Sequence, residues 1–462
     1  MLSSAVIAKF RMFARPQAGL VQFALCGSHG ARVALLGTVL SLASFESAAV
    51  EAPASAEEAL DAYNQWTVGN IEALAEDMPS ITAAAEAAAE KYVTGDWGIA
   101  AAGDYGVLAE ACGRSGGIMA LKWGYPPNYL KLSKDNPQIV LFALREDRYD
   151  KHLRDARKVL DVEHAFVVVM GPQHLLDRAR EDGMPMQASF AVHSAEGEGL
   201  FEMAEGERLA PTTPVASMAA LWAWTAEFVA ACTRHGKMPV MHESYAIPGA
   251  KERAEKLKGQ KFYDEPVKPV AAGELGRLFL KRLRENVEAF YTNERGKMLE
   301  AVKLAWQARE AGKELYTFVH GHSVVQDQVK YAKSPQYLTK LNKNWHKQDD
   351  RYTLEEGDFV FCLGYDHRYQ GNNYGTWHDD AREAGATLVW SLATYRDEHT
   401  KPIREADELL IDQHWEYGDA VVPVPGTDVT IAPTSGHIAQ MILRMFNAGL
   451  IGCEQQDKQQ ER

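Results

Sequence analysis

The sequence is poor in cysteine and lacks the cysteine spacings that cross-link small domains or hold zinc. Its 462 residues include five cysteines, which lie far apart and form no CxxC pair: Cys26, Cys112, Cys232, Cys362 and Cys453. Neither a disulfide framework nor a structural zinc site is therefore expected. A single long-range disulfide stays open.

Basic residues are also in deficit. There are 49 Lys and Arg against 63 Asp and Glu, which gives a formal net charge of −14. Such an excess of negative charge opposes non-specific binding to phosphate backbones and acidic membrane surfaces, so nucleic acid is not expected as a partner. A phosphate-bearing ligand would need a local pocket of amides or basic side chains.

Long hydrophobic runs are scarce as well. The apolar run at 33–42 follows several basic residues and precedes small ones, which is the order of a secretory signal peptide. Residues 1–55 are therefore expected to be a leader, with a disordered N-terminus as the alternative. The leader predicts an exported or periplasmic protein, and a cytoplasmic one is the alternative. No other run approaches about 20 apolar residues, so no stable membrane span is expected.

What the sequence does contain is a repeat. Three segments of the first half recur in the second at nearly the same spacing: 98–103 as 315–321, 139–143 as 359–363, and 210–213 as 432–435. The first two pairs are short apolar strand patterns, and each member of the third pair precedes a helical pattern. Duplication of one structural unit is the economical explanation.

Within each half, short apolar runs alternate with helical patterns, which is typical of parallel strands covered by helices on both faces. Further strands are expected at 165–170 and 387–392, with helices over 81–92, 150–160, 298–311 and 378–384. The sequence thus predicts an α/β fold with two tandem, doubly wound, flavodoxin-like parallel-sheet domains. Their expected extents are 56–250 and 270–452, joined by a linker at 251–269 and followed by a polar tail at 453–462.

Short motifs in both halves point to one family. They are Glu110, Arg114, Gly116 and Gly117 in the first half, and Gly321-His322-Ser323, Ala406 to Asp412, Gly418-Asp419-Ala420 and Ala432-Pro433-Thr434-Ser435 in the second. Together they resemble the signature of a little-characterised branch of the sugar isomerase (SIS) domain proteins, in which GHS opens the domain and GDA and AP-x-S close it. The resemblance implies a tandem SIS protein.

The resemblance implies a small sugar or sugar phosphate as the ligand and aldose–ketose isomerisation as the reaction, with no cofactor. SIS isomerases often carry a catalytic glutamate on the helix after the first strand and a histidine at the start of the closing helix, which points to Glu110 and His437. Glu110 has a simpler alternative role in an ion pair with Arg114 four residues on. The family's phosphate-gripping loop is replaced by 144–147 and 364–367, which argues against a phosphate grip there.

Open parallel sheets bind ligands beyond the carboxyl ends of their strands. Candidate substrate-binding residues in such places are Gly103, Asp104, Arg114, Ser115, Thr212, Thr213, His322, Ser323, Asp366, His367, Arg368, Thr434 and Ser435. The hydroxyl residues at 212–213 and 434–435 have a simpler alternative role as helix N-caps.

A metal site is a weaker alternative. His320 and His322 would share one side of an extended strand, and His367 follows the next expected strand. The spacing matches no strong motif, so no metal is expected.

Two further functions stay open beside the isomerase: a non-catalytic sugar-binding protein, and a metal-dependent carbohydrate lyase or hydrolase. Whether the chain is an enzyme is therefore open, with an isomerase favoured. Self-association into a homo-oligomer is left open too. Because the two halves carry different residues, one composite site is expected in place of two equal ones.

Overall fold

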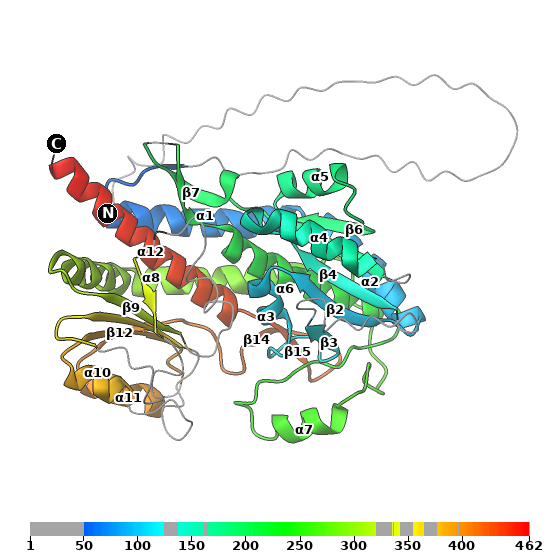
Figure 1. Ribbon diagram of the computed structural model, residues 1–462. Coiled ribbons are helices and arrows are strands. Elements are labelled where there is room, and N and C mark those ends of the chain that lie inside the picture. Colours follow the sequence, from blue (N-terminus) through cyan, green and yellow to red (C-terminus); the bar gives the residue numbers. More distant parts are fainter. Residues whose placement is uncertain are drawn as a thin grey trace, which may run out of the picture. The chain divides into compact units, whose positions relative to one another are not determined.

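The computed structural model describes residues 50–461, except for 124–136, 161–164, 205, 320–334, 336, 342–353, 365–376 and 396. From residue 50 onward these residues belong to one compact unit. Two parallel sheets and a set of long helices make up that unit (Figure 1).

The first half is built on a parallel sheet in the order β3-β2-β4-β5-β6. Its strands are β2 (Gly98–Gly103), β3 (Leu121–Trp123), β4 (Gln138–Ala143), β5 (Ala165–Gly171) and β6 (Ala188–Ala191). The direction of winding reverses between β2 and β4, as in flavodoxin-like folds. Three of these strands are the apolar runs that the sequence predicts.

The second half repeats this arrangement in the order β10-β9-β11-β12-β13, again with every pair parallel. Its strands are β9 (Leu315–Val319), β10 (Thr339–Lys340), β11 (Phe359–Leu363), β12 (Thr387–Leu392) and β13 (Leu409–Asp412). The predicted α/β fold with two tandem parallel sheets is confirmed. The identical strand order supports duplication of one unit.

Each half closes with an antiparallel hairpin that sequence reasoning missed, followed by a long buried helix. The first half has β7 (Gly199–Glu202), β8 (Arg208–Pro211) and α6 (Thr213–Arg234); the second has β14 (Ala420–Pro423), β15 (Thr430–Pro433) and α12 (Ser435–Gln460). The short strand β1 (Val50–Glu51) pairs with β7. The hairpins were missed because their strands are only four residues long.

The repeat extends to unusual backbone conformations. The residue before the first hairpin strand has a positive φ in both halves, 62° at Glu198 and 68° at Asp419. The second hairpin strand also contains an alanine with positive φ in both halves, 62° at Ala210 and 57° at Ala432. Non-glycine residues rarely adopt this region, and such strain clusters at functional sites.

The helices before the first strand of each half are longer than predicted. The expected helix at 81–92 lies within α2 (Met78–Thr94), which follows α1 (Ala56–Glu76), and the one at 298–311 is the end of α8 (Glu274–Glu310). Helix propensity obscured both, because Pro79 begins α2 and Gly296 interrupts the pattern of α8. The remaining helices are α3 (Tyr105–Ala111), α4 (Tyr149–Leu160), α5 (Gln173–Glu181), α7 (Ala250–Leu257), α10 (Trp377–Glu383) and α11 (Asp397–Glu405).

One large core serves both sheets. On β4, Ile139 and Leu141 face this core, while Val140 and Phe142 face a smaller one that also contains residues of α4 and α5. Phe361 of β11 belongs to the same large core. Helices α1, α8 and α12 pack against one another within it (Figure 1).

Helix α6 corrects one expectation. Within the described ranges it is long and apolar enough to cross a bilayer, although sequence reasoning found no such run beyond the leader. The whole of its apolar window is buried in the protein. A helix that is apolar on all sides and covered on all sides is typical of the centre of a large core.

Candidate functional site

Residues from the two halves meet at the start of α12. Arg114, which lies just after α3, donates from Nη2 to Ser435 Oγ at 2.8 Å and to Asp419 Oδ2 at 3.3 Å. Its Nε lies 3.3 Å from Oε1 of Glu110, so the predicted ion pair is present. We call Glu110, Arg114, Asp419 and Ser435 the composite cluster. These residues are brought together from opposite ends of the chain.

Backbone and hydroxyl groups hold the same junction. Ser115 Oγ donates to the carbonyl oxygen of Gly418 at 2.8 Å. The amide of Ala432 donates to the carbonyl oxygen of Gly116 at 3.0 Å. The segment after α3 is thereby fixed against the hairpin of the other half.

Glu110 is the most unusual member of the cluster. Its side chain is fully buried, with Arg114 and Trp222 as its polar neighbours. Burial raises the pKa of Glu110, the Arg114 cation works against that rise, and the Asp419 carboxylate adds to it. The carboxylate lies against Gly436, where an added Cβ would stand 2.0 Å from Oε1. Only glycine leaves room for this carboxylate.

Asp419 organises the start of α12. Its Oδ1 accepts from the Ser435 amide at 3.1 Å, and its Oδ2 accepts from Ser435 Oγ at 2.7 Å. A carboxylate at this end of a helix satisfies a backbone N–H that has no partner within the helix and also complements the helix dipole. The cap of α12 thus comes from the hairpin, not from its own first residues.

The expected N-cap role of the hydroxyl residues is therefore wrong. Neither Thr212 nor Thr434 makes a side-chain cap bond. Thr212 Oγ1 instead accepts from the Ala195 amide at 2.9 Å and donates to the Glu198 carbonyl at 3.1 Å. Thr213 and Thr434 are buried, and their hydroxyls have no partner. Both cap residues have φ and ψ near the helical region, which differs from the extended geometry of a side-chain cap.

His437 follows Gly436 in the first turn of α12. It is fully buried, and within the described part of the chain neither ring nitrogen has a hydrogen-bond partner. Burial lowers the pKa of His437 to about 3, so the imidazole is neutral at physiological pH. A neutral imidazole offers one nitrogen that donates and one that accepts.

Gly103 and Asp104 lie at the carboxyl end of β2, apart from the composite cluster. Gly103 has a φ of 93°, and a Cβ there would stand 2.1 Å from the Ala143 carbonyl oxygen. Asp104 accepts from the Gly106 amide at 2.9 Å and lies 3.6 Å from Arg145 Nη1. Burial raises the pKa of Asp104, while Arg145 opposes the rise. Asp104 is therefore held in an ion pair with Arg145 at this end of the first sheet.

Several candidate residues lie outside the described residues: His320, His322, Ser323, Asp366, His367 and Arg368. The weaker metal alternative depends on three of these histidines. Within the described part of the chain, no group of three or more His, Cys, Asp or Glu side chains is arranged to hold a metal ion.

Sequence reasoning missed a histidine–carboxylate pair that occurs once in each half. His414 Nε2 lies 3.3 Å from Glu294 Oε1, and His193 Nε2 lies 3.6 Å from Asp77 Oδ2. In both pairs the carboxylate belongs to the helical segment before the first strand, and the histidine precedes the hairpin. Aligning the two halves through these loops would have revealed both pairs, because their spacing is nearly equal.

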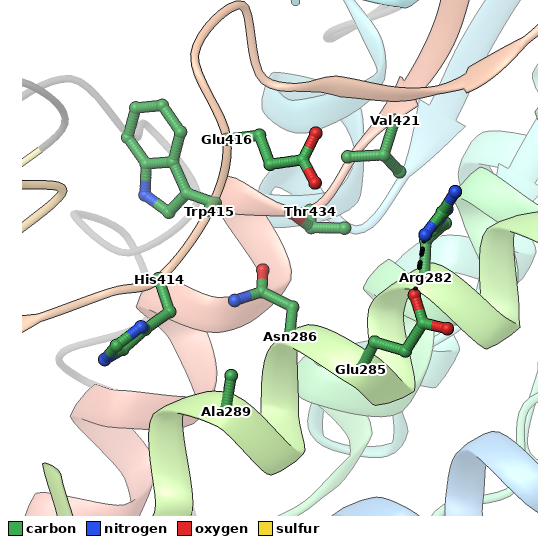
Figure 2. A pocket seen from close by; sticks show the side chains of 9 residues that line it. All are labelled: Arg282, Glu285, Asn286, Ala289, His414, Trp415, Glu416, Val421 and Thr434. Atoms are coloured by element: carbon green, nitrogen blue, oxygen red, sulfur yellow. Dashed lines mark hydrogen bonds and ion pairs between the residues drawn. The ribbon is translucent and has the colours of Figure 1, made fainter. Parts of the chain in front are cut away.

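A pocket of roughly 180 Å³ lies beside the composite cluster, between α8 and the segment that leads into β14 (Figure 2). Its lining residues are Arg282, Glu285, Asn286, Ala289, His414, Trp415, Glu416, Val421 and Thr434. Thr434 thus faces this pocket, while the next residue, Ser435, faces Arg114. Only Thr434 was singled out from the sequence as a binding residue.

No protein-family model matches the chain, and no curated protein matches it in sequence. Solved structures do match over most of its length. Tagatose-6-phosphate ketose/aldose isomerase from Escherichia coli is 8% identical with a TM-score of 0.44, covering 87% of this chain and 95% of that one. The C-terminal domain of glucosamine-fructose-6-phosphate aminotransferase from Francisella tularensis is 8% identical with a TM-score of 0.43, covering 84% and 95%.

Glucosamine-6-phosphate deaminase from Thermotoga maritima is 9% identical with a TM-score of 0.38, and the match covers 83% of this chain and 94% of that one. With identities this low and TM-scores below 0.5, the reaction of this chain must be inferred from its own residues.

Proposed function

We propose that the protein is an aldose–ketose isomerase acting on a small sugar or sugar phosphate at the composite cluster. The observation that carries this proposal is the Glu110 carboxylate. It is fully buried, has a raised pKa and faces the start of a helix from the other half. A buried carboxylate whose pKa is raised by its surroundings is a candidate general base.

The proposed chemistry moves one proton between adjacent carbons. Glu110 takes the proton from C2 of the open-chain aldose, which gives an enediol, and returns it to C1. The hydroxyl proton at O2 moves to O1 in the same conversion, so the ketose has the same atoms as the aldose. His437 is suited to that second transfer because its neutral ring has two unpartnered nitrogens.

Arg114 has a positioning role in this scheme. It joins Glu110 of its own half to Asp419 and Ser435 of the other. Its cation would also stabilise negative charge that develops on the enediol oxygens. The cluster works only when both halves contribute, which agrees with the expectation of one composite site.

Non-catalytic sugar binding is the second candidate function. The same Arg114 network favours it, because buried ion pairs across the junction hold the halves together without any chemistry. The two functions differ in whether Glu110 is needed for turnover or only for structure.

Glu110→Gln tests the choice. The variant keeps the shape of the side chain and removes the base, so turnover of the aldose or aldose phosphate that the wild type converts should fall at least 100-fold, as for loss of a general base. The matched control is Glu243→Gln, since Glu243 pairs with Arg253 on the surface. Turnover by Glu110→Gln at the wild-type rate would overturn the isomerase assignment, and ligand binding without turnover by the wild type would favour sugar binding.

A further inference from the structure

The pocket between α8 and the segment leading into β14 has two buried oxygens without partners. Asn286 is 8% exposed and Thr434 is 1% exposed. Among the described residues, neither Asn286 Oδ1 nor Thr434 Oγ1 has a hydrogen-bond partner. The Asn286 amide rises from α8 towards Thr434 and the Trp415–Glu416 segment (Figure 2). An unmade hydrogen bond at a buried polar group costs about 1–3 kcal/mol. A ligand that donates a hydrogen bond to each oxygen would recover this free energy.

In the first half, the hydroxyl oxygen that corresponds to Thr434 Oγ1 has a hydrogen-bond partner within the protein. Thr212 stands in the first half where Thr434 stands in the second, directly after the proline that ends the hairpin. The Ala195 amide donates to Thr212 Oγ1 at 2.9 Å, which closes that site from within the protein. In the second half the corresponding oxygen faces a pocket. The two halves therefore differ at matched positions, and the second leaves this site to a ligand.

Charge in the pocket wall selects the kind of ligand. Arg282 is paired with Glu285 at 2.9 Å, as Figure 2 shows, and His414 is paired with Glu294 at 3.3 Å. Glu416 is exposed, and among the described residues it has no ion pair. The unbalanced charge at the wall is thus negative. The Glu416 carboxylate would repel a phosphate or carboxylate ligand, and the cationic side chains of the wall are already paired with carboxylates.

The remaining lining residues are Ala289, Trp415 and Val421, all largely apolar. A ligand that fills the pocket needs hydroxyl donors on one edge and an apolar surface of C–H groups on another. We propose that this pocket is a second ligand site, separate from the composite cluster, that binds a small neutral polyhydroxy compound. The ligand's hydroxyls donate to Asn286 Oδ1 and Thr434 Oγ1, and its carbon skeleton packs on Val421.

Titration calorimetry of the full chain with glucitol, glucose and inorganic phosphate tests this site. Glucitol has no carbonyl group to isomerise, so its binding is measured independently of turnover. Saturable binding of glucitol or glucose at one site per chain, with none of phosphate, is expected. Asn286→Leu and Thr434→Val should each weaken that binding tenfold or more. Glu110→Gln should leave it unchanged, which separates this proposal from the isomerase proposal.

The matched control is Asn293→Leu, because Asn293 lies on the same helix but is exposed and bonds its own helix at 2.7 Å. If Asn286→Leu fails to fold, Ala289→Leu carries the test, since it fills the pocket from a half-buried position without removing a polar atom. The proposal is wrong if no neutral polyol binds, if phosphate binds as well as glucitol, or if Ala289→Leu binds glucitol like the wild type.

Discussion

At the scale of single residues, the contact between Glu110 and Gly436 is the tightest constraint on the composite cluster. A Cβ at position 436 would stand 2.0 Å from Glu110 Oε1, far inside van der Waals contact. Trp222 and Arg114 contact the carboxylate, so it has little room to move away from position 436. Even a small side chain at position 436 is therefore expected to displace the Glu110 carboxylate before it distorts the helix.

Gly436→Ala should lower the free energy of unfolding by about 1–3 kcal/mol, the usual cost of overpacking a core. Urea denaturation measures this change. The control is Gly296→Ala in α8, where an added Cβ meets nothing within 4 Å and helix propensity favours alanine. An unchanged urea midpoint for Gly436→Ala would show that Glu110 is not held against the start of α12.

A second residue-scale prediction concerns the pH dependence of stability through His414. The hydrogen bond to Glu294 raises the pKa of His414 above its usual 6.5, and burial opposes the rise. For Glu294, burial raises the pKa, but the hydrogen bonds from His414 and Lys297 have the larger combined effect. The pKa of Glu294 is therefore lowered overall. A raised histidine pKa adds stability below its unfolded value, and this contribution is lost as pH rises through the folded value.

Wild-type protein should therefore lose more stability than His414→Gln between about pH 5.5 and pH 8.5, the range in which histidine titrates. The comparison needs urea midpoints for both proteins at both pH values. Glu294 stays ionised across this range, since its lowered pKa places its own loss of stability at lower pH. Parallel pH profiles for the two proteins would contradict the pairing.

Residue-scale prediction from sequence succeeded for residues close together along the chain and failed where the chain returned from far away. The ion pair of Glu110 with Arg114 follows from four-residue spacing, and it is present. Asp419 was noticed only as part of a motif, because its role as the cap of α12 depends on the fold of the hairpin. Asn286 carried no signal, since an isolated amide in a helical pattern normally faces water.

At the scale of elements, the start of α8 depends on a carboxylate from another helix. Glu227 of α6 is fully buried and accepts from the amides of Gly273 and Gly276 at 2.7 and 2.8 Å. It also accepts from Thr82 Oγ1 at 2.9 Å. Three donors satisfy this one carboxylate, which joins α2, α6 and α8.

Glu227→Gln should destabilise the protein by about 1–3 kcal/mol, because the amide turns one N–H donor towards a backbone donor and loses charge-assisted bonds. Urea denaturation gives the value, with Glu285→Gln on the exposed face of α8 as the control. A surface carboxylate change is expected to stay within about 0.5 kcal/mol. Equal effects of the two variants would mean that Glu227 does not hold the start of α8.

Elements were predicted well where hydrophobic periodicity was strong. Strands β2, β4, β5, β11 and β12 appear at or within a residue of their expected bounds, because apolar runs of five to seven residues are hard to place elsewhere. Strand β9 begins at the expected Leu315, and its expected end at 321 lies outside the described residues. The hairpins were missed, because four-residue strands interrupted by proline and glycine carry little periodicity. The segment that leads into the second hairpin contains Asp419 and part of the pocket wall, so this part of the candidate site was the less predictable part.

At the scale of the whole molecule, the two halves are alike in fold and joined in one core. Inner-face residues of both sheets, such as Leu141 and Phe361, belong to one hydrophobic cluster. Arg114 and Asp419 add an ion pair across the same junction. The two halves thus form one compact body with a shared core.

Calorimetric unfolding should therefore give a single transition, with equal calorimetric and van't Hoff enthalpies. Asp419→Asn should shift that transition to lower temperature without splitting it, since the core would still be shared. Two separated transitions in the wild type would show that the halves unfold independently.

The central claim is that Glu110, completed by the other half, acts as the base of an isomerase. Its most direct test is proton NMR in D2O with a panel of aldoses and aldose phosphates. The claim predicts that the wild type converts one of them to its ketose, with the C2 proton either carried to C1 or replaced there by deuterium, and that folded Glu110→Gln does so at least 100-fold more slowly. No conversion of any member of the panel, or conversion by Glu110→Gln at the wild-type rate, would contradict it.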